Sequence, residues 1–257
     1  MFLVFNKDKI MSYIVTVFTV AMLFITATVV NSNTAQTVET SANTSKLIPI
    51  YSVDTEEKKI AITINCAWNA DDIDMILDTL KKQDVKVTFF MVGDWIEKNP
   101  DAVKKIHEAG HEIANHSYNH PHVNNLSLEE NKQQIQKCSD LIKNITGEGT
   151  KLYRGPYGEY NNTVIEAAEA LEHKTIQWSI DTLDYKGLTG EQMWERIEPK
   201  LENGSIILMH NGTENTALSL NEIITKIKDK GFIPVTVSEL IFKDNYKINS
   251  NGVQSSK

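Results

Sequence analysis

The 257-residue sequence contains only two cysteines, Cys66 and Cys138, which are too few for a disulfide scaffold. It has no long run of lysine or arginine, and its 34 acidic residues outnumber its 26 basic residues. Binding to nucleic acid phosphates needs a concentrated cationic surface, so we expect no nucleic acid partner. Low complexity is also absent, and 41% hydrophobic residues in a chain of this length can bury a large core.

The N-terminal segment has a strongly apolar pattern. Residues 10–30 carry no charge and are about long enough to cross the hydrocarbon core of a bilayer. Lys7 and Lys9 precede this run and no basic residue follows it closely, which favours a cytoplasmic N-terminus and an extracytoplasmic remainder. We expect residues 1–30 to be a signal-anchor that holds the protein at the membrane. The alternative is a signal peptide cleaved within 31–35, followed by secretion.

Composition divides the rest of the chain into three parts. Residues 31–49 are rich in Ser, Thr, Asn and Ala without periodicity and predict a flexible linker. Residues 50–243 are predicted to form one domain. Residues 244–257 are polar and aperiodic, which predicts a frayed tail. No pattern in the sequence indicates an oligomeric state.

Within 50–243, short β-rich runs alternate with segments of helical periodicity. Capping-box spacing at Ser127 with Glu130, and at Thr189 with Gln192, predicts two helix starts. Runs that are almost entirely apolar, such as 205–209, are typical of parallel strands covered on both faces. The alternation therefore predicts an α/β fold with a parallel sheet, and seven repeats favour a barrel. The predicted strands are 59–64, 86–92, 111–114, 151–153, 175–180, 205–209 and 232–237.

Polar side chains follow several of these strands, at the edge where barrels of this kind do their chemistry. His116 and His120 are four residues apart, a spacing that suits Zn²⁺ but also occurs in surface or capping roles. Arg154 precedes a turn that contains Gly and Pro, and His210 ends the strand 205–209. Two acids, at 181 and 184, follow the strand 175–180. Their convergence at one mouth of a barrel predicts an active site.

The ordered motifs HSYNH (116–120), RGPYG (154–158), DTLDY (181–185) and LMH (208–210) resemble those of the NodB-type polysaccharide deacetylases. This carbohydrate esterase family has a distorted (β/α) barrel of about seven strands. Details of the motifs look most like the sporulation-type branch. The resemblance implies a divalent metal, commonly zinc, whose bound water attacks the acetamide carbonyl of an N-acetylated sugar.

The resemblance also implies which residues hold the metal and the base. His116 and His120 would be metal ligands, and Arg154 would position the catalytic base. The first family motif is usually TFDDG, whereas this chain has TINCA at 63–67. Asn65 therefore occupies the position of the base, and Cys66 that of the metal-binding Asp. An amide cannot accept a proton at neutral pH, whereas a thiolate can bind zinc.

The remaining roles concern the leaving group and the substrate. By resemblance, His210 would protonate the leaving amine and Asp184 would hold His210 in place. The turn at Tyr157 would donate a backbone amide to the oxyanion. Tyr185 stands where the family usually has Trp, and Leu208 would line the pocket for the acetyl methyl group.

Three acidic residues could replace the missing carboxylate of the first motif. Asp71 and Asp72 follow the motif closely, but acidic residues are also favoured at a helix N-terminus, and a helical pattern starts at residue 73. Asp181 lies in the DTLDY motif. We expect the N-terminus of a helix to be the better explanation of the first two.

Three hypotheses about function follow. The first is an extracytoplasmic, metal-dependent deacetylase of cell-wall or spore polysaccharide, either peptidoglycan or an N-acetylglucosamine polymer. The second is a catalytically impaired homologue that binds glycan or has a structural role in the envelope. The third is an esterase or amidase that acts on another acyl group, because a fold does not fix a substrate.

Overall fold

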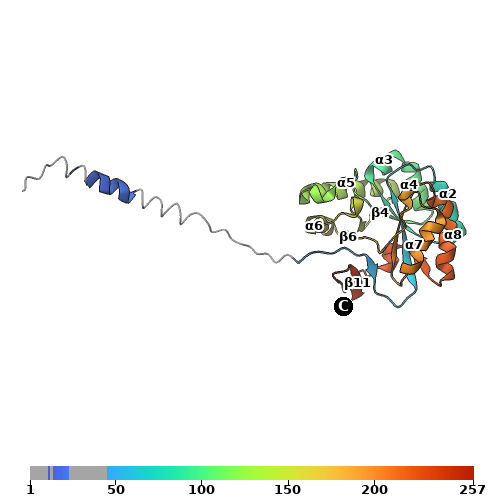
Figure 1. Cartoon of the computed structure of the whole chain (residues 1–257). Helices are drawn as coiled ribbons and strands as arrows, with labels where there is room; N and C mark the ends of the chain where they lie inside the picture. Colours follow the sequence, from blue (N-terminus) through green and yellow to red (C-terminus); the bar gives the residue numbers. More distant parts are fainter. Residues whose placement is uncertain (1–10, 12–13, 23–44) are drawn as a thin grey trace, which may run out of the picture. The chain divides into compact units, whose positions relative to one another are not determined.

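A computed structural model of the chain describes residues 11, 14–22 and 45–257 (Figure 1). Residues 14–22 are helical. No helix among the described residues is both long enough and apolar enough to span a bilayer. Only residues 11 and 14–22 of the predicted signal-anchor over 1–30, and residues 45–49 of the predicted linker over 31–49, are described, so both stay predictions. Residues 46–257 form one structural unit.

The centre of this unit is a sheet of eight strands in the order β6-β5-β4-β3-β2-β8-β7, with β9 also paired to β2. Every pairing in this sheet is parallel. The sheet curls into a half-barrel, which confirms the predicted distorted barrel. Its strands are β2 (Lys59–Cys66), β3 (Thr88–Met91), β4 (Glu112–Asn115), β5 (Leu152–Tyr153), β6 (Lys174–Thr175), β7 (Ile180–Asp181), β8 (Ile206–His210) and β9 (Ile233–Val235).

Helices surround the sheet (Figure 1). Both predicted capping boxes are present, at Ser127 with Glu130 and at Thr189 with Gln192. Short 3₁₀ turns at Pro156–Gly158 and Asp184–Lys186 follow β5 and β7. The helices are α2 (Ile73–Lys82), α3 (Gly93–Lys98), α4 (Pro100–Glu108), α5 (Leu128–Thr146), α6 (Asn162–Ala170), α7 (Gly190–Ile197), α8 (Thr216–Asp229) and α9 (Val237–Leu240).

Strand β2 shows how the sheet separates two cores. Its residues Ile60, Ile62 and Ile64 pack with helix side chains in a large outer cluster, whereas Ala61 packs in a smaller cluster inside the curl. Successive side chains of a strand point to opposite faces. Asn65 therefore faces the inside with Ala61.

The predicted strand 175–180 is wrong, because this run pairs with two different strands. Ile176 N donates to Tyr153 O of β5 at 2.8 Å, whereas Ser179 N donates to Ile206 O of β8 at 3.0 Å. The chain passes from one end of the sheet to the other between these residues. It forms the short strands β6 and β7 in place of one strand.

The prediction of a frayed tail over 244–257 is also wrong. Two strands, β10 (Tyr246–Ile248) and β11 (Val253–Ser256), form a small sheet with β1 (Ser52–Val53). Gln254 is buried, and its side chain exchanges two hydrogen bonds of 2.9 Å with the backbone of Phe242. Three of the four residues of β11 are polar, so hydrophobic periodicity could not reveal this strand.

Candidate functional site

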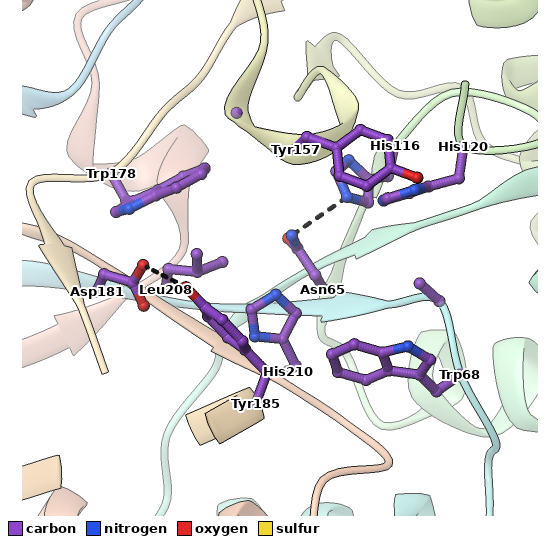
Figure 2. A pocket seen from close by; sticks show the side chains of 12 residues that line it. Asn65, Trp68, His116, His120, Tyr157, Trp178, Asp181, Tyr185, Leu208 and His210 are labelled. Carbon is purple, nitrogen blue, oxygen red and sulfur yellow. Dashed lines mark hydrogen bonds between the residues drawn. The ribbon is translucent and has the colours of Figure 1, made fainter. Parts of the chain in front are cut away.

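A cavity of about 480 Å³ opens at the carboxyl ends of β2, β4, β7 and β8 (Figure 2). This is the edge at which the sequence predicts the site. Trp68 and Trp178 also line the cavity, and neither is among the predicted site residues. The predicted residues that line it are Asn65, His116, His120, Tyr157, Asp181, Tyr185, Leu208 and His210.

Asn65 lies at the floor of this cavity and connects two buried groups. Its Oδ1 accepts a hydrogen bond of 2.9 Å from Nη1 of Arg154, and its Nδ2 lies 3.2 Å from Nε2 of His116 (Figure 2). A guanidinium only donates hydrogen bonds, so the amide oxygen must face Arg154 and the amide nitrogen must face His116. The amide therefore donates to the imidazole.

The second nitrogen of His116 fixes the tautomer of this ring. Nδ1 lies 2.8 Å from the carbonyl oxygen of Arg154 and can only donate to it. Burial first, and then the neighbouring His120, hold the pKa of His116 well below its ordinary value. The ring is therefore neutral, and Nε2 carries the lone pair that accepts from Asn65. In His ligands to metals, a lone pair of this kind holds the ion.

His120 lies close to His116, with 5.1 Å between the ring centroids. The loop between them has left-handed backbone at Ser117 (φ 68°) and His120 (φ 56°). Gln134 of α5 fixes this loop, because its Oε1 accepts from Ser117 Oγ, Tyr118 N and Asn119 N at 3.0–3.2 Å. No motif in the sequence points to Gln134, because it lies on another element.

The structure does not bring Cys66 to the histidine pair. Its side chain is fully buried in the outer cluster, on the opposite face of β2 from Asn65, and does not line the cavity. Burial first, and then Asp72, raise the pKa of the Cys66 thiol well above its usual value. Zinc binds the thiolate, so this environment disfavours the ligand form.

Two of the three possible replacement carboxylates also lie away from the cavity. Asp72 accepts hydrogen bonds from Gly212 N at 2.7 Å and Asn211 Nδ2 at 3.2 Å, and Asp71 is exposed. Asp181 does line the cavity, and its Oδ1 accepts from Leu183 N at 2.8 Å.

The residues present do not fit a catalytic zinc ion. Such an ion usually has three protein ligands and an open position for water. Here two neutral imidazoles converge, and the lone pair of His116 already accepts a hydrogen bond from Asn65. Throughout the part of the chain that the structure describes, no three His, Cys, Asp or Glu side chains converge in a way that could hold a metal.

Arg154 is completely buried behind Asn65. Besides Asn65, its guanidinium donates to Thr63 Oγ1 at 2.9 Å and to the carbonyl oxygen of Gln177 at 3.0 Å. Its Cζ lies 3.9 Å from the ring centroid of Phe90. It forms no ion pair with a carboxylate of the described residues. Burial without such a partner lowers the pKa of Arg154 to about 9.

His210 and Asp184 form a second polar unit. Asp184 is fully buried, and its Oδ1 lies 2.9 Å from His210 Nδ1. Its Oδ2 accepts from the backbone N of His210 at 2.6 Å and from Thr216 Oγ1 at 2.7 Å. Thr216 belongs to none of the sequence motifs, because it lies on α8 beyond the last of them.

Aromatic side chains form the rim of the cavity. Trp68 and Tyr185 contact the ring of His210, with centroid distances of 5.2 and 5.3 Å, and both are about half exposed. Tyr157 has left-handed backbone (φ 58°) in the 3₁₀ turn after β5, and its ring contacts His120. Exposed aromatic faces beside a polar floor provide apolar contact area for a ligand with both polar and apolar faces.

Comparisons with known proteins agree with this geometry. The family model for polysaccharide deacetylase matches residues 52–176. The peptidoglycan-N-acetylglucosamine deacetylase of Bacillus cereus is 32% identical over 186 residues, which cover 71% of this chain and 68% of that protein. The chain therefore belongs to the polysaccharide deacetylase family. It is 38% identical to the uncharacterized protein YlxY of Bacillus subtilis over 75% of its own length, but spans only 60% of YlxY.

One of the solved structures similar to this chain is that of a pseudoenzyme. The crystal structure of a carbohydrate esterase family 4 pseudoenzyme from Bacillus anthracis matches with a TM-score of 0.72 and 36% identity, over 75% of this chain and 68% of that chain. A mutant of that protein is described as having restored enzymatic activity, and its structure matches with the same TM-score.

Proposed function

We propose that the cavity binds an N-acetylated sugar of a cell-wall polysaccharide, and that the wild-type chain does not hydrolyse it at the rate of a family deacetylase. One observation carries this proposal. The Asn65 amide stands at the base position and donates to the lone pair of His116. A carboxylate at this position could accept a proton, whereas the amide cannot.

Binding of a sugar is supported by the cavity and by the relatives. A volume of about 480 Å³ with aromatic side chains around a polar floor suits a small polar ligand. The Bacillus cereus relative is named for deacetylation of N-acetylglucosamine in peptidoglycan. We infer the same class of polysaccharide here.

Loss of hydrolysis is supported by the first motif. Removing a general base typically costs a factor of about 10² to 10⁴ in rate. Among the described residues, the wild-type donor set also lacks a third ligand beside His116 and His120. The Bacillus anthracis pseudoenzyme is a precedent for this loss within the family.

Deacetylation by the wild-type chain is the second candidate. The hydrogen-bonded pair of His210 and Asp184 favours it, because a proton donor for a leaving amine has no obvious use in a protein that only binds sugar. For this candidate to hold, the Nε2 of His116 must be released from Asn65. An ester or another amide as substrate would place the same demands on these residues.

Calorimetry and acetate release test these alternatives together. We expect the purified protein to bind N-acetylglucosamine oligomers but to release no acetate from them, or from O-acetylated sugars, with or without Zn²⁺. Trp68→Ala should weaken binding, whereas Trp194→Phe, in the outer cluster away from the cavity, should not. Acetate release that is lost on chelation would overturn the proposal in favour of the second candidate. An absence of binding to any oligomer would overturn both.

We also propose that the N-terminal segment anchors the domain outside the cytoplasmic membrane. The uncharged run at 10–30 and its preceding lysines support this location. Membrane fractionation with protease accessibility in intact protoplasts tests it. A role in sporulation stays a prediction from the motifs.

A further inference from the structure

Arg154 is a buried cation that lacks a carboxylate partner among the described residues. Its side chain is completely buried, and its donors are met by the oxygens of an amide, a hydroxyl and backbone carbonyls. A buried charge is normally paired, because desolvation without an opposite charge is costly. Asn65 stands between this guanidinium and the cavity, so the field of Arg154 acts on whatever occupies the cavity floor.

The floor also offers hydrogen-bond donors to such a ligand. The Asn65 amide nitrogen carries two N–H groups, of which the lone pair of His116 takes one. His210 lines the cavity and turns its Nδ1 to Asp184, which leaves Nε2 as the nitrogen that can meet a ligand. Arg154 polarises the amide by holding its oxygen at 2.9 Å. Donors backed by a cation favour a negatively charged acceptor.

Two acidic residues near the cavity carry negative charges that could offset the positive charge of Arg154. Asp184 is buried and accepts four hydrogen bonds, from His210 N and Nδ1, Thr216 Oγ1 and Tyr185 N. Its charge is therefore largely matched by donors. Asp181 lines the cavity at the β7 end, and its charge opposes an anion there. An anion bound in the cavity is therefore stabilised most at the floor beside Asn65.

We propose that the floor of the cavity is a carboxylate site, in which a negative group of the ligand lies against Asn65 and serves as the missing partner of Arg154. The ligand is then an N-acetylated sugar that carries a carboxylate, as N-acetylmuramic acid does beside its acetamide. That the ligand is a sugar rests on the proposed function, whereas its negative charge is inferred from the residues at the cavity floor alone.

Acetate and acetamide test the charge directly, because they have nearly the same shape and differ in charge. Calorimetry at constant ionic strength should show that the purified protein binds acetate at least about tenfold more tightly than acetamide. Asn65→Asp supplies an internal carboxylate to Arg154 and should abolish this preference. Asp181→Asn removes the opposing charge, keeps the shape and should strengthen acetate binding. Equal affinity for the two probes, or an unchanged preference in Asn65→Asp, would overturn the carboxylate site.

A sugar comparison separates this inference from the proposed function. N-acetylmuramic acid should bind more tightly than N-acetylglucosamine to the wild type, and the two should become similar in Asn65→Asp. Equal binding of both sugars to the wild type would overturn the carboxylate site and leave the proposed function standing. Binding of neither sugar, with the preference for acetate intact, would overturn the proposed function and leave the carboxylate site standing.

Discussion

Replacing Asp184 with an asparagine should destabilise the domain strongly, although it removes no atom from the core. The carboxylate is fully buried and accepts four hydrogen bonds, at 2.6 Å from His210 N, 2.9 Å from His210 Nδ1, 2.7 Å from Thr216 Oγ1 and 2.9 Å from Tyr185 N. These donors come from β8, α8 and the 3₁₀ turn after β7. Asp184 therefore joins three elements beside the cavity.

The cost of Asp184→Asn follows from the donors that the amide could no longer satisfy. One oxygen of the amide can accept two of the four hydrogen bonds, and its NH₂ group faces the other two donors. A hydrogen bond to a charged group contributes about 1.5–3 kcal/mol, and a buried donor left unpaired costs a similar amount. We expect a loss of roughly 3–5 kcal/mol in the free energy of unfolding.

Urea unfolding followed by circular dichroism measures this loss. Asp181→Asn is the matched control, because Asp181 is only partly buried and accepts one short hydrogen bond, from Leu183 N at 2.8 Å. The control should lose less than about 1 kcal/mol. A loss below about 1 kcal/mol for Asp184→Asn, or equal losses for the two variants, would show that the four hydrogen bonds to Asp184 do not stabilise the domain in this way.

Three further predictions concern other parts of the domain. Burial first, and a nearby lysine second, lower the pKa of His111 to about 4. The folded domain therefore favours the neutral imidazole, and the stability that this preference supplies is complete above the unfolded-state pKa of about 6.5. That stability is lost as the pH falls toward 4. His111→Gln should therefore reduce the drop in urea midpoint between pH 7 and pH 5, and an unchanged drop would contradict this. A Cβ on Gly204 (φ 77°) would lie 1.7 Å from a carbonyl oxygen, whereas one on Gly149 meets nothing within 4 Å. Melting curves should show Gly204→Ala losing about 2 kcal/mol or more and Gly149→Ala changing by less than about 0.5 kcal/mol; similar losses would argue against the contact. Gln134→Ala should weaken oligosaccharide binding about tenfold by releasing the loop 117–120, whereas Gln136→Ala, whose side chain bonds to a neighbouring exposed acid, should not.

The fold could be predicted from the sequence where each segment has a single environment. The apolar residues of β2 and the capping boxes at Ser127 and Thr189 led to the correct elements. The prediction of one strand over 175–180 failed, because the backbone of this run changes partners between β5 and β8. The strand β11 was not predicted, because its one buried side chain is the polar Gln254. Periodicity records side chains, whereas both failures depend on backbone pairing between distant residues.

The site was predictable to the extent that its residues lie in short motifs at strand ends. His116, Tyr157, Asp181 and His210 meet around one cavity as predicted. The position of Cys66 depends on where β2 ends. The predicted strand 59–64 stops short of it, but the strand continues to residue 66 and turns its side chain away from the cavity.

Supporting residues were harder to predict, because they lie on other elements. Gln134 on α5 fixes the loop of the two histidines, and Thr216 on α8 binds Asp184. Neither belongs to a motif, and only the packing of these helices against the sheet brings them to the site. Most of the side chains that line the cavity could be predicted from the sequence, although Trp68 and Trp178 were not, whereas those that orient them required the structure.

We propose that one amide at the base position, that of Asn65, stops the chemistry of this site. Acetate release from an N-acetylglucosamine oligomer, with Zn²⁺ present, tests this proposal in the wild type and in Asn65→Asp. We predict no release by the wild type and an increase of at least about 10²-fold in Asn65→Asp. Chelator-sensitive release by the wild type at the rate of the variant would contradict the proposal. So would silence in Asn65→Asp while it binds zinc and the oligomer.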